Sequence, residues 1–466
     1  MDFDSFLHLY QSVYFNLPRP IKTFLGGIYG KIPLNVRFGK GYDIHKKIVE
    51  KFEESDEQYQ LDFIYNKTYE TLQFAQEHIP YYQKLFNEYS FQVKDFKSLS
   101  DINKLPRLTK EIIQKELNNL HTTKFDKAVA YYTGGSSSTP MKILAPMQTS
   151  RAKEKAYNNY IFSKAGYKYR DNMVALKGRD SSDAKKDIYW EYQLIDNQML
   201  VSGVYLEKEY IEKIVEEIKR YKPKYFYGYP SAVEAFIKAC KLKNINSLDG
   251  IYGVFLISES VFPEHIDMMK EFFNCPIVSH YGHTERVSIS YRIDHEPYNF
   301  LNSYGLTRII NDEMVVTSFD NFVMPYINYS TKDFVNGELD LYKDSDVVKR
   351  AGTIEGRIQE YVVADDGSTM SILSIGAGHY SSYDGVDVAQ FYQDKPGFVT
   401  LFVQSSDPKK VQVEKMIEQM EVQVRNRIKF NVVFKEKIEK TSRGKRRLCI
   451  QKLDIEKYKL ADKKIE

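Results

Sequence analysis

The sequence has few cysteines and little net charge. Cys240, Cys275 and Cys449 are the only cysteines among 466 residues, and no two of them form a CxxC pair. This spacing argues against a disulfide framework and a zinc ribbon, and favours a reducing cytoplasm as the location. The 66 Lys and Arg residues nearly balance 63 Asp and Glu, giving a formal net charge of +3. No strong overall field therefore attracts nucleic acid or an anionic membrane, and any basic function must be local.

Long apolar runs are also lacking. Nowhere do about eighteen apolar residues follow one another, and the N-terminus, with Asp2 and Asp4, lacks the basic start of an export signal. We therefore expect no transmembrane segment and no export. The aromatic stretch from Phe3 to Tyr29 leaves peripheral contact with a membrane surface or a partner open. Packing onto the main body is the favoured interpretation, because exposed aromatic patches are uncommon on soluble proteins.

The sequence is rich in hydrophobic residues, which make up 42% of the chain and can build a sizeable core. In its middle part, short apolar runs alternate with amphipathic stretches. We expect helices at 207–221, 231–241 and 264–273, and strands at 224–227, 250–257 and 276–279. Such alternation is typical of βα units, so the fold class is α/β, with a large N-terminal domain of mostly parallel sheets flanked by helices.

The pattern changes after Asp333 to shorter strands and turns. The segment Ala364-Asp-Asp-Gly-Ser is a hairpin signal. Further on we expect a strand at 398–403, a helix at 409–428, a strand at 431–434 and a final strand. A small α+β C-terminal lid domain is thus predicted, with residues 1–356 forming the large domain and 357–466 the small one. Before this, Thr109 suits the N-cap of a helix.

One segment concentrates the residues that bind phosphate. Thr133 to Lys142 reads Thr-Gly-Gly-Ser-Ser-Ser-Thr-Pro-Met-Lys. Consecutive glycines let backbone amides turn toward an anion, and hydroxyl groups add further donors. It is not a P-loop, because no Gly-Lys-Ser/Thr ending follows. Taken alone, the segment fits a flexible polar turn equally well.

Further segments, which occur in the expected order along the chain, complete a resemblance to a known protein superfamily. The glycine-serine segment resembles the signature of the adenylate-forming superfamily, which includes acyl-CoA synthetases and nonribosomal adenylation domains. Its Tyr-Gly-x-Thr-Glu and Tyr-Arg-Thr-Gly-Asp motifs are similar to Tyr281–Glu285 and Tyr329–Asp333, followed by Gly356-Arg357 and Thr441–Lys445. Within the superfamily the chain looks like the phenylacetate-CoA ligase branch and its capsular polysaccharide relatives of the CapK type. The segments that carry this closer likeness are His78–Tyr82, Leu105–Lys110, Gly228–Ser231 and Ile257–Glu259.

The resemblance implies ATP and Mg²⁺ as cofactors and assigns their contacts. The β- and γ-phosphates of ATP would be held by Thr133, Gly134, Gly135, Ser136, Ser137, Ser138 and Lys142. Adenosine would be bound by Glu259, Tyr281, Gly282, Asp333 and Arg357, with Tyr281 on adenine and Asp333 on the ribose hydroxyls. Thr284 would contact the α-phosphate, and Glu285 would hold Mg²⁺. Read singly, Glu285 would be a surface acid and Asp333 a turn residue.

Lys445 is the residue expected to act in the chemical step. A carboxylate attacks the α-phosphorus while negative charge accumulates on oxygen, and an ammonium group placed there lowers the barrier by ~3 kcal/mol. The catalytic set is then Lys445, Glu285 and Thr284. The simpler interpretation is a solvated basic turn, because Lys440, Arg443, Arg446 and Arg447 lie in the same segment. Such a turn also leaves RNA binding open, although we expect no nucleic-acid partner.

The acid and its acceptor are less defined. Tyr227, Tyr229, Ser258 and the stretch before Tyr281 are expected to line the substrate pocket, and their aromatic character fits an aryl or other apolar carboxylic acid. A hydroxylated acid remains open. Coenzyme A is the default acceptor implied by the resemblance, and a sugar or carrier in surface polysaccharide biosynthesis is the alternative. Ser231 is expected to cap the helix below this pocket.

Two competing interpretations rest on specific residues. Ser138 stands where the superfamily usually has glycine, Thr139 where lysine is common, and Asn328 and Gln359 also depart from its pattern. These changes favour a catalytically degenerate nucleotide-binding subunit of a polysaccharide biosynthesis system. A zinc site of Cys275, His280 and His283 would lack an evident fourth ligand.

Overall fold

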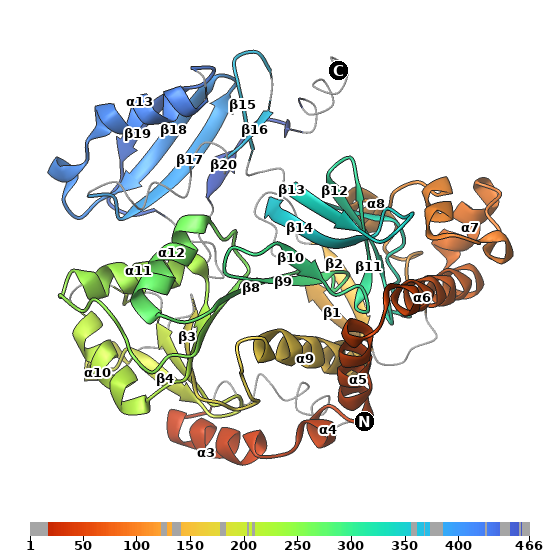
Figure 1. The fold of residues 1–466 in the computed structure, drawn as a ribbon, viewed down its shortest axis with the longest axis horizontal. Coiled ribbons are helices and arrows are strands. Elements are labelled where there is room, and N and C mark those ends of the chain that lie inside the picture. The colour runs from red at the N-terminus through yellow and green to blue at the C-terminus, as the bar shows by residue number, and fades with distance from the viewer. Residues whose placement is uncertain are drawn as a thin grey trace.

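The computed structural model describes residues 17–122, 128–132, 141–177, 183–202, 205–206, 210–355, 361–367, 369–372, 385–424, 426–438, 448–455 and 458. Most of this part of the chain is organised around one large sheet, which Figure 1 shows below a separate, smaller sheet formed by the C-terminal residues. The predicted domain boundary at 356/357 lies outside the described residues.

In the described part of the chain, the large sheet has 12 strands in the order β11-β12-β13-β14-β10-β9-β8-β7-β6-β3-β5-β4. Its first half along the chain comprises β3 (Met173–Lys177), β4 (Trp190–Gln193), β5 (Gln198–Ser202), β6 (Tyr225–Gly228), β7 (Gly253–Ile257) and β8 (Ile277–Gly282). The second half comprises β9 (Ile289–Ile293), β10 (Tyr298–Phe300), β11 (Gly305–Ile310), β12 (Glu313–Ser318), β13 (Tyr329–Leu341) and β14 (Val348–Glu355).

The strands β5, β3, β6, β7 and β8 are parallel, whereas the remaining pairs of this sheet are antiparallel. Figure 1 shows helices α10 (Ile211–Tyr221), α11 (Pro230–Lys241) and α12 (Pro263–Phe273) on one side of the parallel strands and α9 (Met147–Ser163) on the other. Because both faces are covered, the strands are apolar without alternation, as in the run Gly-Val-Phe-Leu-Ile of β7, whose first four residues are buried.

The N-terminal helices pack at several places around the large sheet. They are α3 (Arg19–Gly30), α4 (Leu34–Arg37), α5 (Lys40–Glu54), α6 (Glu57–His78), α7 (Pro80–Glu88) and α8 (Lys110–Glu116). Helix α3 contacts β4, α5 contacts α9, and α6 contacts β11. Short 3₁₀ helices are η1 (Val93–Asp95), η2 (Leu99–Lys104) and η3 (Ala184–Lys186). Two antiparallel strands, β1 (Ala128–Tyr132) and β2 (Lys142–Pro146), flank residues 133–140.

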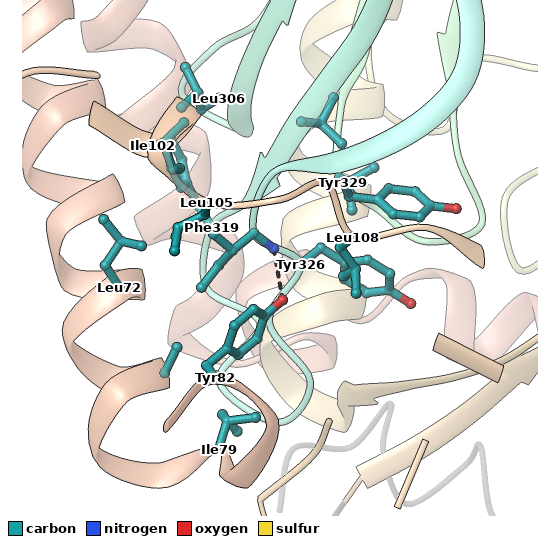
Figure 2. Packing of buried hydrophobic residues seen from close by; sticks show 14 of the residues in the cluster. Leu72, Ile79, Tyr82, Ile102, Leu105, Leu108, Leu306, Phe319, Tyr326 and Tyr329 are labelled. Atoms are coloured by element: carbon teal, nitrogen blue, oxygen red, sulfur yellow. Dashed lines mark hydrogen bonds between the residues drawn. The ribbon is translucent and has the colours of Figure 1, made fainter. Parts of the chain in front are cut away.

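A hydrophobic cluster joins α6 and α7 to the start of β13 (Figure 2). The phenol of Tyr82, a fully buried side chain, donates to the carbonyl of Pro325 at 3.0 Å and accepts from the amide of Ile327 at 3.1 Å. The segment 105–108 packs in the same cluster, where Leu108 forms a parallel bridge with Tyr329. Burial of these aromatic and aliphatic side chains thus fixes where the chain enters β13.

The C-terminal residues build a four-stranded sheet in the order β19-β18-β17-β20. Its elements are β17 (Val388–Lys395), β18 (Phe398–Gln404), η6 (Pro408–Lys410), α13 (Val413–Gln423), β19 (Lys429–Phe434) and β20 (Cys449–Gln451), beside the hairpin of β15 (Tyr361–Val363) and β16 (Thr369–Ser371). Phe262, from the loop before α12, packs into the hydrophobic cluster of this small sheet. Lys238 of α11 donates to the carbonyl of Val386 at 3.2 Å, so the two parts of the chain are in contact.

The predicted α/β fold class with a small α+β C-terminal part is confirmed. The expected βα alternation between residues 207 and 282 is present, although the large sheet is mixed because its second half pairs in antiparallel meanders. Thr109 caps α8 by accepting from the amide of Ile112, and β15 and β16 pair as the expected hairpin on either side of the 364–367 segment. The helix predicted at 409–428 is wrong at both ends, since α13 spans Val413–Gln423, and β17 was not predicted.

No helix in the described ranges combines the length and the apolar character that crossing a bilayer requires.

Candidate active site

Three parallel strands end at the same edge of the large sheet, and several predicted site residues lie there. In the register, Gly228 of β6 pairs with Leu256 of β7, and Ile257 pairs with His280 of β8. Tyr229, Ser258 and Tyr281 therefore lie next to one another at the carboxyl ends of these strands. Open α/β sheets bind ligands at this edge, because the loops leave room there for a molecule outside the strands.

Ser258 follows β7 in a backbone conformation that side chains rarely adopt. Its φ is 65°, and the amide of Glu259 donates to the carbonyl of Ile257 at 2.9 Å, closing a tight turn. A serine at positive φ is strained. The turn ends the strand abruptly, so that Ser258 and Glu259 lie at the edge of the sheet beside Tyr281.

Tyr281 and Asp333 are brought together although they are 52 residues apart in sequence. The phenol of Tyr281 donates to Oδ2 of Asp333 at 2.5 Å. The Nε2 atom of His283 lies 2.6 Å from this phenol oxygen and 3.0 Å from the same carboxylate oxygen. The side chains of His283 and Asp333 are only 5% and 7% exposed. The three groups thus orient the Asp333 carboxylate in a largely buried setting.

Sequence reasoning treated His283 only as a weak zinc ligand. It occupies the variable position of the Tyr-Gly-x-Thr-Glu segment, and a histidine there is the only sequence signal for its contact with Asp333. In the described ranges, no three His, Cys, Asp or Glu side chains are grouped as metal ligands.

Glu285 is buried and only partly satisfied. Its Oε1 accepts a hydrogen bond from the phenol of Tyr329 at 3.3 Å, whereas its buried Oε2 has no hydrogen-bond partner among the described residues. A buried carboxylate oxygen without a partner is costly, and a cation would compensate for it. Mg²⁺ is commonly held by one or two carboxylates together with phosphate oxygens and water, so Glu285 fits the ion that the resemblance implies.

Arg286 links this turn to the strands around residues 133–140. Its guanidinium lies over the ring of Tyr131 in β1, 4.5 Å from the ring centroid, and its Nε atom lies 3.7 Å from Glu154 of α9. Arg286 also donates to the hydroxyl of Ser150. These contacts place the base of the β1–β2 hairpin beside the turn that carries Glu285. Sequence reasoning did not select Arg286.

Asn328 has a structural role that explains its departure from the family pattern. It has φ of 54°, a conformation that asparagine tolerates well, and it is buried. Its side chain accepts from Arg308 at 2.6 Å and donates to the carbonyl of Leu105 at 2.8 Å. Asn328 therefore fixes the chain immediately before Tyr329 and ties it to the 105–108 segment.

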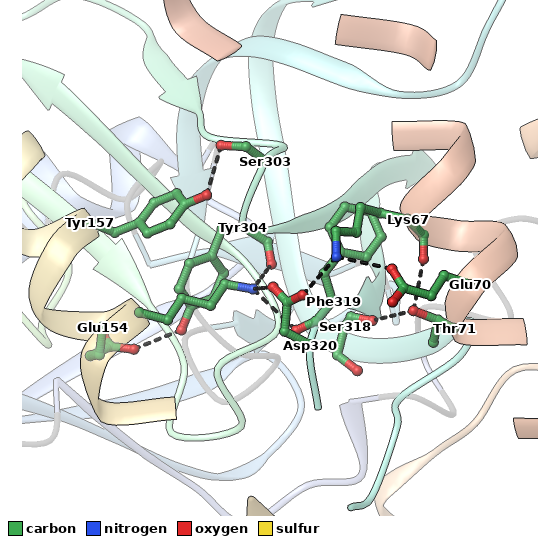
Figure 3. Close-up of polar contacts among 11 residues, drawn as sticks. Lys67, Glu70, Thr71, Glu154, Tyr157, Ser303, Tyr304, Ser318, Phe319 and Asp320 are labelled. Atoms are coloured by element: carbon green, nitrogen blue, oxygen red, sulfur yellow. Dashed lines mark hydrogen bonds and ion pairs between the residues drawn. The ribbon is translucent and has the colours of Figure 1, made fainter. Parts of the chain in front are cut away.

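A buried ion network connects α9 to the segment around Asp320 (Figure 3). The Lys153 ammonium donates to the carbonyls of Tyr304 and Phe319 at 2.7 and 3.1 Å and to Oδ2 of Asp320 at 2.9 Å. These three acceptors satisfy its three protons. Lys67 of α6 pairs with the other oxygen of Asp320 at 3.0 Å. Although burial alone would raise it, the two ammonium groups lower the pKa of Asp320.

The stretch before Tyr281 contributes a buried histidine. Alternate residues of a strand point to opposite faces, so His280 lies on the face covered by α9, away from Tyr281. Its Nε2 atom is buried without a hydrogen-bond partner among the described residues. Burial lowers the pKa of His280, opposed by the charge of Glu154, and therefore favours neutral imidazole. Tyr227 packs against Phe162 of α9 on the same face, with ring centroids 5.9 Å apart.

Some of the remaining predicted residues lie inside the described ranges and others lie outside them. Lys142 is exposed and begins β2 opposite Tyr132, Gly282 is exposed at the end of β8, and Thr284 is exposed in the turn after it. Ser231 was expected to cap a helix; this is wrong, because α11 begins at Pro230 and its N-cap is Tyr229. The predicted residues outside the described ranges are Thr133, Gly134, Gly135, Ser136, Ser137, Ser138, Thr139, Arg357, Gln359 and Lys445.

Comparisons with known proteins agree with the resemblance. No protein-family model matches the chain. Protein CapK from Staphylococcus aureus is 22% identical over 455 residues, which cover 95% of this chain and 99% of that protein. The chain is therefore similar to CapK along nearly its whole length.

Solved structures show the fold. A 2-hydroxyisobutyryl-CoA ligase in the postadenylation state, in complex with 2-HIB-AMP, has a TM-score of 0.64 at 15% identity, covering 86% of this chain and 91% of that one. The same ligase in the thioesterification state, with 2-HIB-AMP and CoA, has a TM-score of 0.51 at 14% identity, covering 88% and 93%. Both matches show that the chain has the fold of this ligase.

Proposed function

We propose that this homologue of CapK, which has the fold of adenylate-forming CoA ligases, activates a carboxylic acid with ATP and transfers the acyl group to an acceptor. The first half-reaction joins the acid to AMP and releases pyrophosphate. In the second, a nucleophile on the acceptor attacks the acyl carbon and AMP leaves. Binding both reactants in one site supplies much of the rate advantage through positioning.

The observation that carries the proposal is the convergence of separate motif segments at one edge of the sheet. The Tyr281–Asp333 hydrogen bond joins the ends of β8 and β13, and the Tyr329–Glu285 contact joins the same two segments a second time. Arg286, stacked on Tyr131, adds the β1–β2 hairpin. A single ATP molecule could therefore contact the residues assigned to its base, ribose and phosphates.

Each proposed role then follows from the chemistry of the side chain. Asp333 offers carboxylate oxygens to the ribose hydroxyls, and Tyr281 holds that carboxylate in place. Glu285 has the unpartnered oxygen that would hold Mg²⁺, and the ion would offset the charge of the phosphates. Thr133 to Ser138 and Lys142 would bind the β- and γ-phosphates, and Lys445 would stabilise the charge that develops at the α-phosphate.

The buried histidine extends the proposal to the acid. If the acyl group lies beside the stretch before Tyr281, the neutral imidazole of His280 can exchange a hydrogen bond with a polar substituent on it. A site that offers a buried hydrogen-bonding group rejects molecules that leave it unpaired. This favours an acid with a hydroxyl or similar group over a purely apolar one, although Tyr227 and Tyr229 leave room for aromatic character.

The acceptor and the cellular role are extensions of the resemblance. Coenzyme A is the acceptor that fits the phenylacetate-CoA ligase branch, and similarity to CapK supports a sugar or carrier in surface polysaccharide biosynthesis. We propose that the protein acts in the cytoplasm, where ATP and coenzyme A are available. The small C-terminal part is proposed to swing about residues 356–360 between the two half-reactions.

ATP–pyrophosphate exchange against a panel of apolar and hydroxylated carboxylic acids tests the activity. We expect exchange that depends on one class of acid and on Mg²⁺. Lys445→Ala should lower the rate about 100-fold, which corresponds to ~3 kcal/mol. Glu285→Gln should weaken the dependence on Mg²⁺. Glu338→Gln, an exposed residue of β13, is the matched control and should leave the rate unchanged.

The competing functions give different outcomes. A degenerate nucleotide-binding subunit would bind ATP, measured by displacement of a fluorescent nucleotide, but would show no exchange with any acid. An RNA-binding protein would shift RNA in a salt-dependent manner. Exchange that persists at the wild-type rate in Lys445→Ala would remove the assignment of the catalytic lysine.

A further inference from the structure

Helix α3 exposes its bulky apolar side chains and packs through its small ones. Ile21, Phe24, Leu25 and Ile28 are 45%, 68%, 42% and 54% exposed. Their i, i+3, i+4, i+7 spacing places them in one stripe along the helix. A helix on the surface of a soluble protein normally directs such a stripe to the core. In α3 the stripe points away from the protein.

The glycines explain this orientation. Gly26 and Gly30 are buried on the opposite side of α3, which packs against β4 and the turn after it. A Cβ atom on Gly30 would lie 2.5 Å from the carbonyl of Leu194, so only glycine allows this close approach. Lys22 lies on the packed side and pairs with Glu191 at 3.0 Å. The contact between α3 and the body therefore uses small and polar residues and leaves the apolar side chains about half exposed.

The chain segment that contains the stripe is rich in basic residues. Between residues 17 and 50 the acidic residues are Asp43 and Glu50, which pairs with Lys46, whereas the basic residues are Arg19, Lys22, Lys31, Arg37, Lys40, Lys46 and Lys47. Of these, Lys31, Lys40, Lys46 and Lys47 are exposed. Val36 and Ile44, which are 56% and 53% exposed, lie in the same part of the chain. This concentration of positive charge contrasts with a net charge of only +3 for the whole protein.

We propose that α3 lies in the surface of an anionic lipid membrane. An exposed apolar stripe that is followed in the chain by the exposed Lys31 and Lys40 fits the boundary between acyl chains and negatively charged headgroups. The stripe is too small for a stable dimer, which needs roughly 800 Å² from each partner, because it consists of four half-exposed side chains. Figure 1 shows α3 at the edge of the molecule opposite the small sheet, so the C-terminal part would face away from the membrane.

The inference is independent of the proposed ligase activity. It predicts that the full-length protein sediments with vesicles of phosphatidylcholine and phosphatidylglycerol more than with phosphatidylcholine alone, and less at ~0.5 M salt. The variant Phe24→Ser with Ile28→Ser should bind such vesicles at least tenfold more weakly, since two apolar anchors are lost. Lys31→Gln with Lys40→Gln should reduce the preference for the anionic lipid.

The matched control is Leu242→Ser with Tyr252→Ser. These two apolar side chains are 57% and 59% exposed and lie outside the N-terminal segment, so this variant should bind like the wild type. Thermal unfolding and acid-dependent pyrophosphate exchange should be unchanged in all variants, which separates loss of membrane binding from loss of fold or activity. The proposal is overturned if the wild type does not bind either vesicle or if the control loses binding equally. Self-association of the wild type that the Phe24→Ser and Ile28→Ser variant abolishes, without vesicle binding, would identify the stripe as a dimer interface instead.

Discussion

Single side chains orient the groups on which the proposed chemistry depends. Oδ2 of Asp333 lies within hydrogen-bond distance of both Tyr281 and His283. Two residues at the end of β8 therefore determine the orientation of a carboxylate on β13. Ser258 adopts positive φ directly after β7. Such local strain is stored where the surrounding structure over-determines the backbone, and here it lies at the candidate site.

Removal of one hydroxyl tests this arrangement. Tyr281→Phe should raise the KM for ATP roughly 5- to 30-fold, because it removes a hydrogen bond to a charged group worth about 1–2 kcal/mol, with a smaller effect on kcat. Steady-state pyrophosphate exchange at varied ATP provides the measurement. Tyr298→Phe, in the same apolar cluster but without a contact to Asp333, is the control. Equal effects of the two substitutions would contradict an orienting role for Tyr281.

Two titratable residues of α5 act on stability in opposite directions. Burial and the nearby Lys153 lower the pKa of His45 to about 4, so the unfolded chain takes up the proton first and stability falls as pH drops from 6.5 toward 4. Burial raises the pKa of Glu53 to about 7, with Lys164 opposing, so stability rises as pH drops from 7 toward 4.5. In the wild type the two contributions largely cancel in this window.

Separate substitutions should reveal both contributions. We expect His45→Gln to become more stable relative to the wild type as pH falls from 6.5 to 4.5, and Glu53→Gln to become less stable, each by up to ~3 kcal/mol. Urea unfolding at a series of pH values measures the difference. Asn87→Ala, at an exposed residue of α7 that does not titrate, is the control and should show a flat difference. Parallel pH curves for all variants would contradict the assigned environments.

At the scale of elements, α9 is held by the buried ion network rather than by apolar packing alone. Lys153 places a charge among Tyr304, Phe319 and Asp320, and the helix also carries Glu154, which contacts Arg286 at the site. A buried cation with all three protons satisfied allows one position of the helix, since a shift would leave charges unpaired. The network therefore links the position of α9 to the turn after β8.

Two lysines of α9 provide a matched comparison. Lys153→Met should destabilise the protein by about 3–5 kcal/mol, because Asp320 loses a buried partner. Lys155→Met removes a partly exposed ion pair with Asp196 on the same helix and should cost less than about 1 kcal/mol. Chemical denaturation measures both. Similar losses in the two variants would show that the buried network does not hold the helix.

At the scale of the whole molecule, contact between the large and small parts rests on a few residues. Phe262 is 7% exposed because it enters the hydrophobic cluster of the small sheet, and Lys238 reaches the carbonyl of Val386. Phe262 is therefore suited to stabilise the observed arrangement of the two parts.

Shortening this aromatic side chain should shift the balance between arrangements. Phe262→Ala removes contacts worth about 3 kcal/mol in a well-packed site, and we expect acid-dependent pyrophosphate exchange to fall tenfold or more while ATP binding to the large part is retained. Tyr252→Ala, which is 59% exposed, is the control. Wild-type exchange in Phe262→Ala would show that the contact does not favour adenylation.

Much of the architecture was determined locally by the sequence. The apolar runs of β6, β7 and β8, the intervening amphipathic helices, the cap at Thr109 and the β15–β16 hairpin each depend on neighbouring residues, so their patterns predict them. The order of the motif segments likewise predicted the fold class. These features follow from backbone geometry and periodic burial within a few turns of chain.

Only the tertiary structure decided which distant groups meet. The bond between Tyr281 and Asp333, the unpartnered oxygen of Glu285, the antiparallel half of the sheet and the outward face of α3 all depend on long-range packing. Periodicity specifies that Ile21 and Phe24 share a face of a helix, but the close approach of Gly30 to Leu194 determines that this face points outward. Burial and hydrogen bonding between remote segments are properties of the packed chain, and no local pattern encodes them.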